Sequence, residues 1–195
     1  MDPRVRRTRQ LLQQALEKLL ETRAFETLSI QDITDAATLN RGTFYDHYPD
    51  KFALLECMAA GRFHDLLAAR GIIFGGSCAS ALRAIVLGVC DYLSGLPAVE
   101  CEQRRQLEPH MESAIIAVVW GMILDGLKRH APSGVAPPEM IATTISWAIY
   151  GAAKEWLRTP HRPPSEQAAD TIMKLVAPIF PTEASGGTSH AEIDR

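Results

Sequence analysis

Apolar residues recur at helical spacing along most of the chain, and no stretch shows the strict alternation that is typical of a half-buried strand. With glycines and prolines as boundaries, this pattern predicts long helices over residues 4–22, 50–70, 80–93, 110–130, 138–158 and 164–179. Between Gly95 and Pro109 the charged sequence predicts a separate short helix that ends at the proline. Residues 181–195 contain few apolar side chains and predict a disordered tail. The predicted fold class is all-α.

Residues 26–55 differ from this pattern, because they predict two short helices with a tight turn between them and then the start of a third. Ser29 can cap the first short helix and Asn40 the second. Pro49 ends the second, and Asp50 starts the next. The expected inward positions are Ile30, Ile33, Ala36 and Ala37, then Phe44 and Tyr48. This is the pattern of a helix-turn-helix, whose second helix enters the major groove of DNA.

The segment from Arg41 to Lys51, RGTFYDHYPDK, followed by Leu54 and Leu55, resembles the DNA-binding signature of the TetR/AcrR family of bacterial transcriptional regulators. The resemblance implies a helix-turn-helix DNA-binding domain over residues 1–49 and a larger helical effector-binding and dimerisation domain over residues 50–180. The residues expected to bind DNA are Ser29, Asn40, Arg41, Gly42, Thr43, Tyr45, His47 and Lys51. Gly42 would let the backbone approach DNA closely, and Lys51, at a helix start, would contact a phosphate.

Two positions depart from the family pattern. Thr38 stands in the turn where a glycine is common, and a β-branched residue resists a positive φ, so this turn is expected to be strained or differently shaped. Asp46 places an acid beside the presumed DNA-facing surface. It could accept a hydrogen bond from a cytosine amino group or point away from DNA.

The formal net charge of −3 does not indicate a nucleic-acid partner, and residues 1–64 contain nine Lys or Arg against nine Asp or Glu. The distribution is more informative, because Arg4, Arg6, Arg7 and Arg9 face only Asp2 in the first ten residues. Positive potential at this N-terminal arm favours contact with phosphates or the minor groove.

The four cysteines, Cys57, Cys78, Cys90 and Cys101, show no CxxC spacing and no pairing with histidine that would indicate zinc. They are expected to be free thiols, and no metal or other cofactor is expected. Arginines rather than an apolar run follow the first residue, and the apolar stretch Ala114 to Leu124 is too short to cross a bilayer. A cytoplasmic protein with no membrane partner is therefore expected.

The last two predicted helices carry broad apolar faces, formed by Ile141, Ile145, Ala148, Ile149, Ala152, Trp156, Ile172, Leu175, Val176 and Ile179. Gly151 would let another helix approach closely. Two such helices from each subunit would form a four-helix interface in a homodimer. The alternative is that these faces only close the core of a single chain.

The family layout gathers an effector cavity from residues that could equally be plain core, namely Phe63, His64, Cys90, Met111, Trp120 and Met122. Their mixed aromatic, sulfur and aliphatic character favours an uncharged, largely apolar small molecule.

Taken together, these features predict a homodimeric repressor, released from a near-palindromic operator in double-stranded DNA by a small-molecule effector. A redox switch through the cysteines and control by a protein partner remain open as alternatives. A helical enzyme using Glu108 and His110 or Cys101 is disfavoured, because the sequence has no glycine-rich phosphate loop and no metal-ligand spacing. The chain is therefore not expected to be an enzyme.

Overall fold

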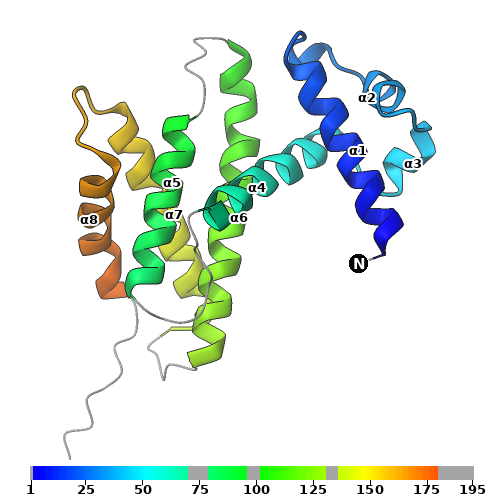
Figure 1. Cartoon of the computed structure of the whole chain (residues 1–195). Coiled ribbons are helices and arrows are strands. Elements are labelled where there is room, and N and C mark those ends of the chain that lie inside the picture. The colour runs from blue at the N-terminus through cyan, green and yellow to red at the C-terminus, as the bar shows by residue number, and fades with distance from the viewer. Residues whose placement is uncertain (1, 70–78, 96–101, 131–135, 180–195) are drawn as a thin grey trace, which may run out of the picture.

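The computed structural model describes residues 2–69, 79–95, 102–130 and 136–179, and within these ranges every regular element is helical (Figure 1). The α-helices are α1 (Pro3–Leu20), α2 (Ile30–Ala37), α3 (Arg41–Tyr45), α4 (Lys51–Ala69), α5 (Ala79–Gly95), α6 (Glu102–His130), α7 (Pro138–Arg158) and α8 (Ser165–Val176). Two short 3₁₀ helices, η1 (Phe25–Thr27) and η2 (Ala177–Ile179), follow α1 and α8. The all-α prediction is confirmed; the predicted tail over residues 181–195 lies outside the described ranges.

The first three helices close around one apolar cluster together with the beginning of α4. Its fully buried side chains include Leu12, Leu16, Phe25, Ile33, Phe44 and Leu54. Ala37 is inward as predicted, but Ala36 is exposed and Thr34 takes the buried position. The reason is geometric, because positions 30, 33, 34 and 37 form one face of an eight-residue helix and position 36 does not.

The remaining helices form a second, larger cluster. α6 makes its most extensive contacts with α7 and then with α4, while α5 packs against α7 and α8. The buried side chains at the centre include Phe63, Ile85, Val89, Ile115, Ile145 and Ile149. Figure 1 shows these helices as a bundle beside the smaller N-terminal group.

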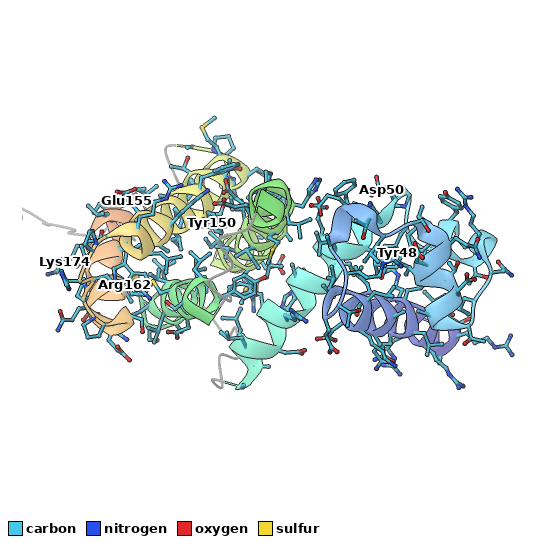
Figure 2. All side chains as sticks on the ribbon, turned by 90° about the horizontal axis from the view of Figure 1, so that it is seen from above. Tyr48, Asp50, Tyr150, Glu155, Arg162 and Lys174 are labelled. Carbon is cyan, nitrogen blue, oxygen red and sulfur yellow. The ribbon has the colours of Figure 1, made fainter. Side chains whose placement is uncertain are left out.

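Helix α4 joins the two parts. Met58 belongs to the N-terminal cluster and Phe63 to the larger one, so the two cores divide within α4. α6 also touches this junction, because the His110 ring stacks on Phe52 with centroids 4.4 Å apart and its Nδ1 lies 2.9 Å from Glu56 Oε1. Figure 2 shows Tyr48 and Asp50 in the smaller part and Tyr150 and Lys174 in the larger one.

The predicted helix break at Pro109 is wrong. α6 runs without interruption from Glu102 to His130 and contains the proline. A proline inside a helix removes one backbone donor and costs about 3 kcal/mol. The apolar side chains that follow it pack against both α4 and α7, and this burial outweighs the local cost.

Helix α6 also contains the one described segment, Leu107–Arg129, that is long and apolar enough to cross a membrane by length and composition alone. The apolar run Ala114 to Leu124 is therefore only the central part of a longer apolar segment. In its most apolar window, 44% of the residues are buried inside the protein, and the core helix of a soluble protein passes the same test.

Most of the apolar face that the sequence assigned to a dimer closes the chain's own core. Ile149 is 0% exposed and Val176 1% exposed. These two side chains are therefore not available to a second chain, but α7 has another apolar edge, on which Met140 is 60% exposed and Trp147 55% exposed. On α8, Leu175 is 64% exposed.

Candidate nucleic-acid interface

The N-terminus of α2 is fixed by a reciprocal capping pair, as predicted for Ser29. The Ser29 hydroxyl accepts from the Asp32 backbone N–H at 3.1 Å, and Asp32 Oδ2 accepts from the Ser29 backbone N–H at 2.7 Å. Asp32 Oδ1 also accepts from Arg23 at 2.8 Å. The hydrogen bonds from Arg23 and then from Ser29 hold the pKa of Asp32 well below its usual range. This pairing of Arg23 with Asp32 was not predicted, although an acid three residues after Ser29 is a known capping signal.

The turn between α2 and α3 has the strained shape that its sequence predicts. Thr38 adopts φ 56° and ψ 44°, in the left-handed region that favours glycine. The Leu39 N–H donates to the Thr34 carbonyl at 2.9 Å, which closes the end of α2, and the half-buried Leu39 side chain packs against the N-terminal cluster. The turn is thus held by a backbone hydrogen bond and an apolar contact in spite of its β-branched residue.

Helix α3 begins at the predicted cap. Asn40 Oδ1 accepts from the Thr43 backbone N–H at 2.7 Å and from the Thr43 hydroxyl at 3.0 Å. A Cβ at Gly42 would lie 3.2 Å from the same Asn40 oxygen, so a larger residue there would press on the cap. The first turn of α3 therefore presents a fixed backbone edge.

The outward side of α3 carries Arg41 and Tyr45, which are joined by a hydrogen bond. The Arg41 guanidinium donates to the Tyr45 hydroxyl at 3.1 Å and lies 5.6 Å from the Tyr45 ring centroid. Both residues are exposed, Tyr45 at 47%. Phe44 and Tyr48 point inward and pack with centroids 5.9 Å apart, as their spacing predicts. The arginine is therefore held on the surface by an aromatic neighbour that is itself accessible.

The remaining predicted residues surround this pair. His47 is half-buried just after α3, and Asp46 is exposed at the C-terminal cap. Asp50 directly precedes α4 and caps its start, where it was predicted to begin the helix, because its Oδ1 accepts from the Ala53 backbone N–H at 2.8 Å. Ser29 and Asn40 lie at the two helix starts, so the structure brings the predicted residues from 40 to 47 into one short surface, with Ser29 one helix away.

Lys51 is placed differently from the other predicted residues. Its ammonium donates to the carbonyls of Phe25, Glu26 and Leu28 at 3.0, 3.2 and 2.8 Å. The side chain is therefore directed at the segment that precedes α2.

The basic residues at the N-terminus lie on α1, in agreement with the helix predicted over residues 4–22. α1 begins at Pro3, and Asp2 caps it by accepting from the Arg4 backbone N–H at 2.8 Å. Arg4, Arg6 and Arg7 are exposed on its first turns. Arg9 is half-buried, and its guanidinium lies 5.5 Å from the Tyr48 ring centroid.

With this geometry in place, a comparison with known families decides the class. Residues 12–58 match the family model of bacterial regulatory proteins of the tetR family. The chain belongs to the TetR family. The match ends at Met58, where the N-terminal core also ends.

Two further comparisons show a regulator and a solved structure to which the chain is similar. The chain is similar to the uncharacterized HTH-type transcriptional regulator YxbF of Bacillus subtilis (strain 168), with 35% identity over 115 residues, which is 57% of the chain. It spans only 30% of the length of that curated relative. The fold is similar to that of RolR in complex with resorcinol, with a TM-score of 0.52 and 16% identity over 90% of this chain and 92% of RolR.

A third similarity is weaker. NalD, the secondary repressor of the MexAB-OprM multidrug efflux pump in Pseudomonas aeruginosa, has a TM-score of 0.46 and 16% identity over 89% of this chain and 96% of its own. The RolR comparison is the one that supports the shared architecture, a helix-turn-helix domain followed by a helical domain.

The six predicted effector-binding residues of this TetR-family chain do not converge. His64 and Met122 line an open groove of about 570 Å³ between α4 and α6. Met111 lines a more enclosed cavity of about 240 Å³ between α5, α6 and α7. Phe63 and Cys90 are fully buried in the core. Trp120 donates to the Thr143 hydroxyl at 3.1 Å, on the contact between α6 and α7.

The enclosed cavity contains charged residues that the sequence did not indicate. Lys154 of α7 lies 2.7 Å from Glu108 and 2.8 Å from Glu112, and of these Lys154 and Glu108 line the cavity. Burial lowers the pKa of Lys154, but the hydrogen bonds to the two carboxylates outweigh it and raise the pKa above its usual value. The i,i+4 spacing of the two glutamates was visible in the sequence, whereas their partner 42 residues after Glu112 was not.

The described cysteines make ordinary structural contacts, and so do Glu108 and His110, the pair that was considered for catalysis. Cys90 is fully buried, and burial raises the pKa of its thiol to about 12. Cys57 Sγ accepts from Gln13 at 3.2 Å. Glu108 pairs with Lys154 and His110 with Glu56, so the two do not act on a shared atom. Cys78 and Cys101 lie outside the described residues; among those described, no three His, Cys, Asp or Glu residues form a metal-binding group.

Proposed function

We propose that this TetR-family chain is a cytoplasmic, homodimeric repressor that binds a near-palindromic operator and is released from it by a small molecule. The observation that carries the proposal is the capped first turn of α3, from which the Arg41 and Tyr45 pair projects into solvent. A short helix with a fixed N-terminus and exposed polar side chains is suited to the major groove.

Within this surface some side chains would contact bases and others phosphates. Arg41 and Thr43 would read base edges, while Tyr45 and His47 would contact phosphates. Gly42 would bring the backbone close to DNA, and Ser29 and Asn40 would fix the two helix starts as well as face the duplex. The exposed arginines at the start of α1 would add sequence-independent phosphate contacts.

This division can be tested on duplexes selected from a random pool by the wild-type protein. Arg41→Ala should lose discrimination between the selected and a scrambled duplex by roughly 1 to 3 kcal/mol. The matched control is Arg83→Ala, because Arg83 pairs with Asp170 at 2.7 Å between α5 and α8. Equal losses for the two variants in fluorescence anisotropy would count against the recognition surface.

The homodimer would form through the outer edges of α7 and α8. Met140 and Trp147 of α7 and Leu175 of α8 are large apolar side chains left exposed by one chain. Gly151 lies on the same side of α7 as Trp147, one turn on, and a Cβ added there would meet nothing within 4 Å. A second copy is the proposed occupant, since each chain offers one recognition helix and a palindromic site needs two.

The dimer proposal is tested by light scattering at micromolar concentration. Trp147→Glu and Leu175→Glu should each shift the mass from two chains toward one, because they place a charge in an apolar interface. Gln14→Glu adds the same charge on an exposed position of α1 and should leave the mass unchanged. A wild-type monomer would refute the proposal.

The effector would enter the cavity between α5, α6 and α7. It is lined by Tyr92, Leu93, Glu108, Met111, Tyr150, Lys154, Leu157 and Arg158. Its volume of about 240 Å³ fits a compact molecule, with apolar walls and a few polar groups. Support from relatives is limited to the printed descriptions, in which RolR was solved with resorcinol and a FadR of Bacillus subtilis with stearoyl-CoA.

Release would follow from the position of α6. This helix lines the cavity with Met111 and touches the start of α4 through His110 and Phe52. A ligand that shifts α6 would therefore tilt the DNA-binding part, with a coupling of about 1 to 3 kcal/mol.

Small molecules can be screened by melting temperature and each hit then added to the operator complex. Met111→Trp should fill the cavity, abolish the stabilisation and leave DNA binding intact. If no stabilising hit lowers operator affinity, oxidation of the thiols and copurified protein partners become the next candidates for the signal.

A further inference from the structure

Lys51 is the first residue of α4, and its ammonium has three donors and no acceptor. All three donors are matched by backbone carbonyls, those of Phe25, Glu26 and Leu28, at 2.8 to 3.2 Å. Leu28 directly precedes Ser29, the cap of α2. The side chain therefore ties the start of α4 to the last carbonyls before α2.

Two aromatic rings enclose the same ammonium. It lies 4.7 Å from the Phe25 ring centroid and 5.9 Å from that of Phe52, and the two rings are 5.3 Å apart. Phe25 is 2% exposed and belongs to the N-terminal core. A cation between ring faces and the carbonyl end of a short helix is stabilised from both sides.

From these contacts we infer that Lys51 is a positioning residue: it holds the segment from η1 to the cap of α2 in register with α4 and makes no phosphate contact itself. The inference rests on the proposed DNA-binding function but assigns this lysine a role opposite to the one that its place in the family signature implies. A phosphate contact would require the ammonium to leave three carbonyls and two rings. The surface that depends on it is the start of α2, where Ser29 lies.

Two variants of Lys51 distinguish a positioning role from a phosphate contact. Lys51→Met keeps the apolar stem and removes the donors. Lys51→Arg keeps the charge, but a planar guanidinium cannot place its donors as a compact ammonium does. A phosphate contact tolerates arginine, whereas a cage of three carbonyls does not. Arg6→Met, at an exposed position of α1, is the control for loss of a phosphate contact.

The measurement is anisotropy of a duplex selected by the wild-type protein, across a salt series and well below every melting temperature. Both Lys51 variants should weaken binding by roughly tenfold at every salt concentration, because misaligned base contacts are lost, with the salt slope unchanged. Arg6→Met should flatten the slope by about 0.9. A flattened slope for Lys51→Met together with near-normal affinity for Lys51→Arg would overturn the inference.

A second readout does not depend on DNA. Amide hydrogen exchange in the first turn of α2 should accelerate in both Lys51 variants, and in Phe25→Leu, which removes a ring without changing any charge. Unchanged exchange in all three would also overturn the inference. If the wild-type protein selects no duplex, the proposed function fails, while the exchange result still decides whether Lys51 positions α2.

Discussion

The N-terminal part and the larger helical part are held together in different ways. α2 has eight residues and α3 five, lengths at which an isolated helix is unstable in water. Each is fixed at its start by a side-chain cap, and the segment before α2 is bound by Lys51. The helices α5 to α8 have 12 to 29 residues and pack mainly through apolar side chains.

The difference concerns what each part must do. Polar caps have strict geometry, so they fix the position of a recognition surface on a small core. An apolar core tolerates changes of shape at nearly constant volume, which suits a part that contains cavities and that, in the proposed function, accepts a ligand and a second chain. The positions of α2 and α3 in the small part should therefore be sensitive to the loss of single polar contacts.

The largest expected effect comes from removing one core side chain in each part. Phe44→Ala should cost about 3 to 5 kcal/mol in the N-terminal cluster, and Ile145→Ala about 2 to 5 kcal/mol in the larger one, since both are 0% exposed. All three tryptophans, Trp120, Trp147 and Trp156, lie on α6 and α7. Tryptophan fluorescence during denaturation therefore reports on the larger part.

The two variants should separate in that assay. Ile145→Ala should move the fluorescence midpoint, whereas Phe44→Ala should abolish operator binding and move the midpoint far less. Equal shifts for both would mean that the two clusters unfold as one cooperative unit, and the comparison would then fail.

The sequence predicted the small part in detail because its signals are local. Ser29, Asn40 and Asp50 each act within four residues, so their positions alone locate the helix starts, whereas α3 ends at Tyr45, before Pro49. It failed where the outcome depends on distant partners. Pro109 was taken as a helix end because the packing of α6 on two other helices is not visible locally.

The same limit explains the errors in the larger part. Apolar periodicity marked α7 correctly, but it could not distinguish the face that meets the chain's own core from the edge that carries Trp147. The six effector candidates were grouped by family layout, and the helix rotations that separate His64 from Met111 are set by packing.

A smaller effect is expected at the strained turn. Thr38→Gly should stabilise the protein by roughly 1 kcal/mol, because a left-handed conformation costs an L-residue about that much and glycine nothing. Ala36→Gly, on the exposed face of α2, should destabilise it by about 1 kcal/mol. Thermal unfolding of both variants measures the sign of each change in stability. A loss of stability in both variants would show that Thr38 is not strained.

The smallest expected effect is the pH dependence of the stability that Asp32 contributes. Because the pKa of Asp32 is lowered in the folded state, its contribution is present above the unfolded pKa of about 3.8 and is lost as the pH falls through the folded value. Asp32→Asn should therefore lower the melting temperature at pH 7, and the difference from wild type should shrink as the pH falls below 4. A difference that is constant with pH would show that the pair with Arg23 contributes nothing as a charge.

The proposed function requires two copies of this chain to recognise one DNA site through α3. Its most direct test is anisotropy of the wild-type protein on a selected duplex, on the same duplex with one half-site scrambled, and on a fully scrambled duplex, each over a salt series. We expect two chains bound per intact duplex, affinity that falls steeply with salt, and a large loss of affinity when one half-site is removed. Equal affinity for all three duplexes at every salt concentration would contradict it.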